Sequence, residues 1–565
     1  MPADRLLAQL EDAKRKLGQV KPSSIERIIR ALARTDFRDP LSLARFHDVV
    51  LFLRAFPPAP STLKLAERVL PSFAARVQQL RDRGTDLSAI EDDEAWSGIA
   101  GSTLTAFLGF DEVAWLNRRF PGQIEIDWDS YENAAQMGYA LPRFVPLLEE
   151  DARVEADVPY RQWLQAASRG RDVEWLIEQI QRMPATPDER VELFASLQLP
   201  IRWRLGNSRA SRTSAKQPVR RIFFHREALI QRRDVSLLQE LAQPPVPLEK
   251  LSTRAGRRMI DFCREATTVR YRELYGTSLG DPASVVRAPV GRGVEIFLWG
   301  LLRERRLPQR AYQAGFTLKN GVPINYIEGI ALFEWMEIGF NTFYAYREGE
   351  TAWVYAQALR MLRQVLGVTC ISVYPYQLGK DNEEAIGSGA FWFYRKLGFR
   401  PMRAELARLA ASEERKIAAD RAHRTSATIL RRLAEGHVVL ELPGSEPGAW
   451  DGFAMRNIGF AIQRRMAQQF GGDASRIREA MQRQVAKALG VTARRWPALE
   501  QKAFADLALL WGMIPNLSRF PESEKRLLLQ MIRAKASGSE GQYLALQRRA
   551  QNLRAGVLRL GYSGR

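Results

Sequence analysis

The chain has 565 residues, of which 46% are hydrophobic and 26% charged, and this composition excludes a wholly disordered or collagen-like protein. Its 84 Lys and Arg residues exceed its 64 Asp and Glu residues, so the net charge is +20. Two cysteines and four scattered histidines are too few for a disulfide scaffold or a thiolate metal site. We therefore expect no bound metal. The length predicts several domains. Because no apolar stretch is long enough to span a membrane, we expect a cytoplasmic protein without membrane contact.

Residues 1–200 predict a helical, acidic-to-neutral region. Apolar residues recur at helical spacing after Ser24 and between Leu63 and Val77, and a proline-rich stretch at 57–60 separates the two patterns. The region contains 25 Lys and Arg residues and 31 Asp and Glu residues. One alternating segment, 123–127, predicts a short strand.

Residues 201–250 predict a basic linker. The segment 202–233 contains ten Lys and Arg residues and one Glu, with Trp203, Phe223 and Phe224 among them. Basic residues interleaved with aromatic residues are suited to binding a nucleic-acid backbone and stacking its bases. A basic loop that packs against the acidic N-terminal region is the alternative interpretation.

Residues 251–402 predict an α/β domain with a mixed sheet. A helix over 251–274 is followed by a β-rich segment at 294–299 and by two strands around Asn320-Gly321, which is a strong hairpin signal. Strand-like sequence at 334–346 then precedes a helix over 351–366, a buried strand over 368–374 and a second helix over 385–396. Residues 403–565 predict a basic domain of helices, with one strand at 438–442.

One run in the central region carries a family resemblance. Residues 393–399 read Phe-Tyr-Arg-Lys-Leu-Gly-Phe, and Ala390 lies four residues before the tyrosine. This run and the order of elements over about 294–402 resemble the GNAT superfamily of acyl-CoA N-acyltransferases. The resemblance implies a GNAT-like fold in the centre of the chain, flanked by mostly helical regions.

The resemblance also implies a substrate, acetyl-CoA, and a place for it. In the family, a glycine-containing turn that leads into a helix binds the pyrophosphate, because free backbone N–H groups and the helix dipole attract an anion. The corresponding turn contains the candidate binding residues Tyr346, Arg347, Gly349, Thr351 and Ala352.

Catalysis in the family is direct transfer of an acyl group to an amine, assisted by a general acid and a general base. Tyr394 takes the position of the general acid, and a core aromatic residue is the alternative interpretation. Glu334 and Glu337 are candidates for the base. Strand alternation places them on opposite faces, so at most one of them faces the cleft. Glu328 is a weaker third candidate.

The turn also departs from the family pattern. Tyr346 and Thr351 stand where the family has other residues, and Glu348 and Glu350 place two negative charges beside the expected phosphate site. These departures favour two alternatives: a non-catalytic GNAT-like scaffold that binds nucleic acid or an acidic protein, and a transferase that uses aminoacyl-tRNA instead of CoA. The amine acceptor is not identified by any motif.

Overall fold

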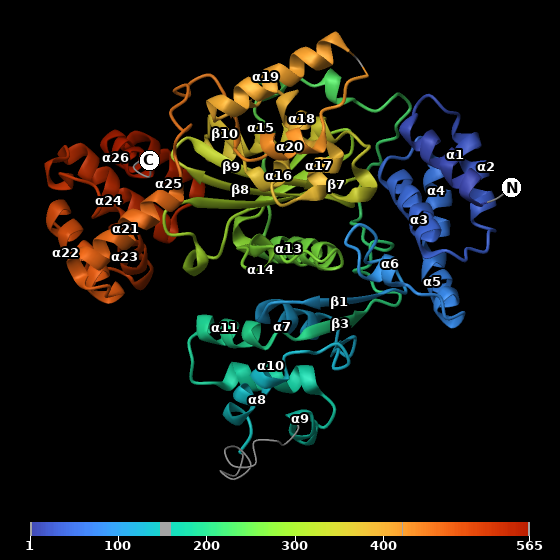
Figure 1. Ribbon diagram of the computed structural model, residues 1–565, viewed down its shortest axis with the longest axis horizontal. Coiled ribbons are helices and arrows are strands. Elements are labelled where there is room, and N and C mark those ends of the chain that lie inside the picture. Colours follow the sequence, from blue (N-terminus) through green and yellow to red (C-terminus); the bar gives the residue numbers. More distant parts are fainter. Residues whose placement is uncertain (1–2, 147–159, 421, 563–565) are drawn as a thin grey trace.

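The computed structural model describes residues 3–146, 160–420 and 422–562. The chain begins with a group of helices, which lies at the right in Figure 1: α1 (Ala3–Arg15), α2 (Pro22–Leu32), α3 (Pro40–Ala55), α4 (Pro60–Val69) and α5 (Phe73–Asp82). Helix α3 is buried over almost its whole length. Its apolar residues belong to the same hydrophobic core as the central sheet, so this group is packed against the sheet.

A second unit has its own hydrophobic core, and it lies below the rest of the molecule in Figure 1. Its sheet has the order β1 (Thr103–Phe107), β3 (Pro200–Arg204), β2 (Ile124–Ile126), and α7 (Phe110–Arg119), α10 (Asp172–Arg182) and α11 (Pro187–Leu197) pack around it. Strand β2 confirms the strand predicted at 123–127. The prediction that the remainder of residues 1–200 is helical was wrong at β1 and at the start of β3.

The central sheet has nine strands. In spatial order they are β11 (Arg400–Pro401), β12 (Val438–Glu441), β10 (Cys370–Val373), β9 (Trp335–Thr342), β8 (Val322–Leu332), β7 (Ala311–Lys319), β6 (Val294–Trp299), β5 (Val286–Gly291) and β4 (Glu249–Lys250). Strands β9 and β10 are parallel, and the other neighbours are antiparallel. The prediction of a mixed α/β architecture with helical flanks is confirmed. The sheet also takes strand β12 from beyond residue 402.

Helices cover both faces of this sheet (Figure 1). Helix α15 (Thr351–Leu366) packs on one face, where the ring of Tyr355 lies 4.8 Å from that of Phe340 on β9. Helices α13 (Thr253–Thr268) and α14 (Tyr275–Ser278) lie on the other face, where the ring of Tyr275 lies 5.7 Å from that of Tyr312 on β7. The second face is only partly covered.

Two local predictions for the central region had different outcomes. The β7–β8 hairpin turns through Asn320 and Gly321, both with positive φ, as a two-residue turn of the primed type requires. The single helix predicted over 385–396 is instead two short helices, α17 (Glu383–Ser388) and α18 (Ala390–Arg395). The chain breaks between them because Gly389 is left-handed, with φ of 66°.

The C-terminal part of the chain is helical, as predicted. Helices α19 (Ala404–Ala419) and α20 (Ala427–Leu433) precede β12. The group at the left in Figure 1 follows: α21 (Met455–Phe470), α22 (Ala474–Leu489), α23 (Ala498–Trp511), α24 (Glu522–Ser537), α25 (Glu540–Arg549) and α26 (Gln551–Tyr562). Among the described residues, none of the helices combines the length and the apolar character needed to cross a membrane.

Candidate functional site

The turn predicted to bind phosphate leads into the first turn of α15. Gly349 packs tightly here, because a Cβ atom at this position would lie 2.7 Å from Cζ of Phe56. No hydrogen bond to the backbone N–H groups of Thr351, Ala352 or Trp353 is found among the described residues, and the N-cap residue Glu350 does not cap the helix with its side chain. The 16-residue helix therefore presents unpaired donors and the positive end of its dipole at this turn.

These donors lie beside a pocket of about 370 Å³. Four of the five residues predicted to bind the acyl donor line this pocket: Arg347, Gly349, Thr351 and Ala352. The segment before α12 (Leu237–Ala242) contributes Ile230, Gln231 and Arg232 to the wall, and α17 and α18 contribute Ser388, Gly389, Trp392, Phe393 and Lys396. Glu348 also lines the pocket. The pocket thus combines helix N–H groups, three cationic side chains, one carboxylate and aromatic rings, and this excess of donors and cations fits an anionic ligand with an apolar portion.

The two glutamates of the turn do not face this pocket as free charges. The carboxylate of Glu350 is buried, pairs with Arg292, lies 3.4 Å from Nζ of Lys319 and accepts a hydrogen bond from the N–H of Ile230. Burial opposes its ionisation, but the Arg292 hydrogen bond and the charge of Lys319 hold the pKa of Glu350 below its ordinary value. Glu348 pairs with Lys14 at 2.6 Å. The negative charges that favoured a site without CoA are therefore neutralised by residues far away in the sequence.

Two of the predicted binding residues are placed differently from the others. Tyr346 is buried, with 2% of its surface exposed, and it does not line the pocket. Burial raises the pKa of Tyr346. Arg347 does line the pocket, but its guanidinium pairs with Glu384 and lies 3.8 Å from the ring centre of Tyr344. Its charge is thus partly compensated before any ligand binds.

Strands β9 and β10 separate at the end of the sheet where the predicted acid lies. Their pairing ends at Ile338 and Val373, although β9 continues to Thr342. Beyond this point the backbone of β9 bonds to a side chain instead of to a strand: Oε1 of Gln377 accepts a hydrogen bond from the N–H of Phe340 at 3.3 Å. The same oxygen accepts from the hydroxyl of Tyr394 at 3.2 Å. Burial raises the pKa of Tyr394, so its hydroxyl remains protonated at neutral pH.

The three candidate bases have different partners. Glu337 lies in the middle of β9, and one of its oxygens is 3.3 Å from Nε2 of His437, which precedes β12. Glu334 lies before β9 and is held by Nη2 of Arg554 at 2.5 Å and by Nε1 of Trp450 at 2.8 Å. Glu328 accepts a hydrogen bond from the hydroxyl of Tyr312. Of the three, Glu337 is the candidate on β9 near the point where β9 and β10 separate. Glu334 instead connects the sheet to the C-terminal helices through its bond to Arg554.

Several residues of this region were not predicted. His437 and Gln377 are distant in sequence from Glu337 and Tyr394, and no spacing rule connects them. Lys396 was within the quoted Phe393–Phe399 run, so its position four residues after Trp392 on one helix face was a usable signal. Arg232 was visible only as one member of the basic segment 202–233.

Part of the basic segment 202–233 is used inside the protein, whereas Arg220, Arg221 and Arg226 are exposed. Trp203 is fully buried in the core of the second unit. Arg212 is buried and donates two hydrogen bonds to Asp48. Phe223 lies beneath the charged groups of Arg292 and Lys319, at 5.0 and 5.1 Å from its ring centre. Arg212 therefore contacts the N-terminal region, as the interpretation of a basic loop packed against that region predicts, whereas Phe223 packs against residues of the central region.

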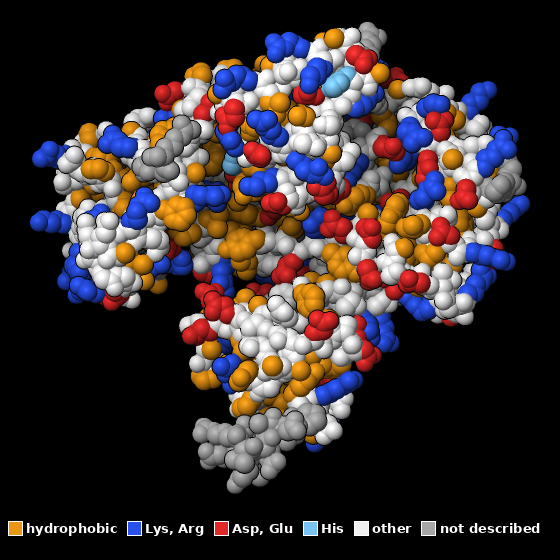
Figure 2. All heavy atoms as spheres, in the orientation of Figure 1, with side chains coloured by type: hydrophobic (Ala, Val, Ile, Leu, Met, Phe, Trp, Pro, Cys, Tyr) orange, Lys and Arg blue, Asp and Glu red, His pale blue; other side chains and the backbone are white. Residues whose placement is uncertain are grey.

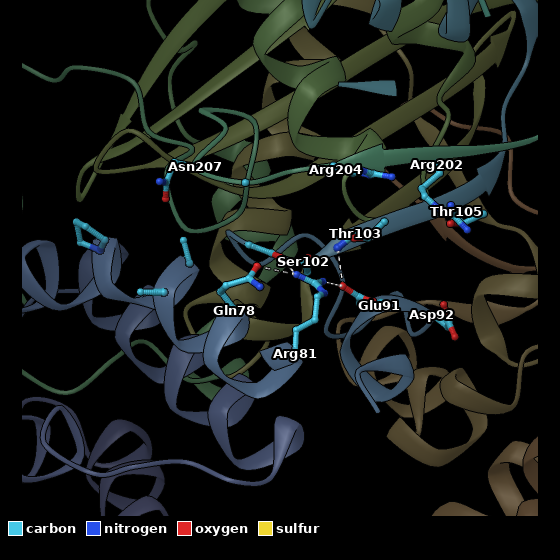
Figure 3. Close-up of a pocket in the computed structure, with 15 residues that line it drawn as sticks. Gln78, Arg81, Glu91, Asp92, Ser102, Thr103, Thr105, Arg202, Arg204 and Asn207 are labelled. Atoms are coloured by element: carbon cyan, nitrogen blue, oxygen red, sulfur yellow. Dashed lines mark hydrogen bonds and ion pairs between the residues drawn. The ribbon is translucent and has the colours of Figure 1, made fainter. Parts of the chain in front are cut away.

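A larger hollow of about 860 Å³ lies between α5 and strands β1 and β3 (Figure 3). Its cations already have partners: Arg81 lies 2.6 Å from Glu91, and Arg202 and Arg204 both donate to Glu125. Figure 3 shows the Arg81 side chain directed at Glu91 and not into open space. This hollow therefore offers a ligand fewer unpaired hydrogen-bond donors and cations than the pocket at α15.

Comparison of the chain with protein-family models, with curated proteins and with solved structures finds no match. Within the described parts of the chain, no group of three or more His, Cys, Asp or Glu side chains is arranged to hold a metal ion. The features that bear on function are therefore the pocket at α15 and the separation of β9 and β10.

Proposed function

We propose that this protein is an acyl-CoA-dependent N-acyltransferase with a GNAT-like central domain, and that it transfers an acetyl group to an amine. One observation carries the proposal: the pocket at the start of α15 brings unpaired helix N–H groups together with Arg232, Arg347 and Lys396. Such donors suit a pyrophosphate, and the aromatic wall of Trp392 and Phe393 suits the apolar part of the same ligand.

The pairing of the glutamates supports this proposal over a site that repels phosphate. Glu350 and Glu348 each have a cationic partner, so the field at the pocket is set by the helix end and by the cations around it. The order strand, hairpin, strand, turn, helix, strand, helix over β6 to α18 also agrees with the order expected of a GNAT-like domain.

The residues around the separation of β9 and β10 fit the proposed chemistry. When bound, acyl-CoA supplies a thioester whose carbonyl carbon is open to attack by an amine. The amine nitrogen forms a bond to that carbon, and the carbon–sulfur bond breaks with its electron pair remaining on sulfur. In this proposal the Glu337–His437 pair takes the proton from the amine. The hydroxyl of Tyr394, which is protonated at neutral pH, gives a proton to the sulfur.

A carboxylate beside an imidazole places two groups that can accept a proton at one point. The carboxylate of Glu337 lies 3.3 Å from Nε2 of His437 and orients its ring. His437 also lies edge-on to the ring of Tyr374 at 5.3 Å, so its orientation is fixed from two sides. About one-third of its side chain remains exposed, with 33% accessible to solvent, so a substrate amine can reach it.

A second candidate function has one observation in its favour. Helices α21 and α22 expose a series of cationic side chains: Arg456, Arg464, Arg476, Arg478, Arg483 and Lys487. Such a surface attracts a polyanion, as a transferase that uses aminoacyl-tRNA requires. This alternative predicts binding to RNA that weakens steeply with salt and does not involve the pocket at α15.

Calorimetric titration with acetyl-CoA tests the proposal. Ser388 is exposed at the rim of the pocket, so Ser388→Trp should fill the pocket without disturbing the core, and we expect the affinity to fall at least about tenfold. Gly387→Trp is the matched control, because the neighbouring position opens into free space and does not line the pocket. Loss of affinity in both variants, or in neither, would remove the pocket from the binding site. Absence of binding to the wild-type protein would reject the acyltransferase and favour the RNA-dependent alternative.

A further inference from the structure

The face of the central sheet opposite α15 is only partly covered by helices. The register of β7, β8 and β9 places Tyr312, Ile330 and Glu337 in one row across this face. Figure 2 shows the surface hollowed between the C-terminal helices and the second unit, with hydrophobic side chains gathered in the hollow. We name this face of the sheet the acceptor cleft and define it by the side chains that strand register, ring contacts and one ion pair bring together there: Tyr275, Arg310, Tyr312, Ile330, Glu337, Tyr374 and His437.

The acceptor cleft has aromatic walls that are open to solvent. Tyr275 on α14 is 45% exposed, and Tyr374, which follows β10, is 44% exposed. Tyr275 packs edge-on against Tyr312, and Tyr374 packs edge-on against His437. The side chain of Glu337 is 21% exposed between them. A small molecule in the cleft would therefore contact rings on both sides and a carboxylate.

Among the described residues, one cation on this face, Arg310, has no hydrogen bond, ion pair or ring contact at its guanidinium. Arg310 is partly exposed and lies two positions before Tyr312 of β7, so strand alternation places both side chains on the same face of the sheet. Burial lowers the pKa of Arg310, and the charge of Glu337 opposes this effect. An arginine that is partly desolvated and unpaired has unused donor capacity.

Two neighbouring arginines differ from Arg310, because their guanidinium groups have partners. Arg305 pairs with Asp188 on α11 at 2.9 Å, and thereby links the second unit to the central unit. Arg306 donates to the carbonyl oxygens of Ala534 and Lys535. Arg305 and Arg306 thus connect the central region to the second unit and to the C-terminal helices, respectively.

We infer that the amine acceptor of this protein carries an anionic group, a carboxylate or a phosphate, which binds Arg310 while its amine lies at the Glu337–His437 pair. This inference rests on the proposed function and names the class of its second substrate. The cleft presents one cation and one carboxylate to the ligand, which is the charge pattern complementary to a molecule with an ammonium and an anionic group. The planar guanidinium suits both carboxylate and phosphate, because it can donate two parallel hydrogen bonds to either.

Matched pairs of amines test this inference. Lysine and cadaverine differ by a carboxylate, and glucosamine 6-phosphate and glucosamine differ by a phosphate. Binding of each probe to the full chain is measured by saturation-transfer NMR, with CoA present. We expect at least one probe with a carboxylate or phosphate to bind at least about tenfold more tightly than the partner that lacks this group, since a charged hydrogen-bonded pair discriminates by about this factor or more.

The variant series assigns this preference to one residue. Arg310→Gln should abolish the preference, and Arg310→Lys, which keeps the charge, should retain part of it. Arg303→Gln is the matched control, because Arg303 is an exposed arginine of the same segment that is not part of the cleft. Three results would overturn the inference: binding of neither lysine nor glucosamine 6-phosphate, equal binding of the two members of each pair, or a preference that persists in Arg310→Gln. Titration of the same samples with acetyl-CoA separates this failure from failure of the proposed function.

Discussion

Glu350→Gln provides a test of the claim that the turn before α15 is held by a buried ion pair. The side chains of Glu350 and Lys319 are both 0% exposed, and Arg292, the second partner, is 27% exposed. Removal of one member of a buried pair costs about 3–5 kcal/mol, because the other charge remains desolvated. Since Arg292 retains contact with water, we expect Glu350→Gln to lower the free energy of unfolding by about 3 kcal/mol, the lower end of this range.

Glu348→Gln, two positions earlier in the same turn, is the matched control. Its partner Lys14 is 11% exposed, but the Glu348 side chain is 42% exposed, so the loss of unfolding free energy should not exceed about 1 kcal/mol. Native-state hydrogen exchange of the α15 amides in urea is the appropriate assay, because a chain with several units does not unfold in a single step. A double variant, Glu350→Gln with Lys319→Met, should recover much of the loss, because it removes the unpaired charge.

Two results would refute this reasoning. Equal, small losses of unfolding free energy in Glu350→Gln and Glu348→Gln would show that the buried charge of Lys319 does not need Glu350 to compensate it. A double variant less stable than Glu350→Gln would show that the ammonium of Lys319 contributes through its contacts with the rings of Phe56 and Phe223, independently of Glu350.

Further predictions concern catalysis and acid stability. Tyr394→Phe should lower turnover about a hundredfold and leave the affinity for acetyl-CoA within a factor of about two, as kinetic and calorimetric measurements can verify. Glu337→Gln should lower turnover similarly, whereas Glu334→Gln should reduce stability and leave turnover of the folded protein unchanged; the opposite pattern would exchange their assignments. Burial lowers the pKa of His225 from 6.5 to about 3, so the unfolded chain binds a proton below pH 6.5 that the folded protein excludes. Unfolding free energy should therefore fall by up to about 1.4 kcal/mol per pH unit between pH 6.5 and 3, and acid titration of His225→Phe should show a shallower fall.

The parts of the fold that local sequence determines could be predicted. The Asn320-Gly321 turn was predictable because few other residue pairs adopt positive φ at both central positions. Helix α15 was predictable from its apolar spacing, and four of its predicted pocket residues lie together because they are within six positions of one another in the chain. In β3 the alternation of buried Ile201 and Trp203 with Arg202 and Arg204 was a usable strand signal, which the high local content of arginine obscured.

The remaining features depend on contacts between distant segments. Nothing near Glu350 in the sequence indicates that Arg292 and Lys319 neutralise it, so its charge appeared to oppose an anion. His437 is 100 positions from Glu337, and their meeting depends on the insertion of β12 beside β10. Arg310 was one of many arginines in the sequence, and only the structure distinguishes it from neighbours that have partners. Long-range pairing of this kind has no periodic signal, which is why sequence reasoning did not find it.

Hydrogen exchange at the start of α15 tests the central claim most directly. The amides of Thr351, Ala352 and Trp353 have no acceptor among the described residues, so they should exchange rapidly in the free protein. Addition of acetyl-CoA at physiological salt should slow their exchange, because its phosphates would accept these hydrogen bonds, and Ser388→Trp should prevent the change. Unchanged exchange at these three amides in a protein that binds acetyl-CoA, or protection confined to the basic surface of α21 and α22, would contradict the proposed site.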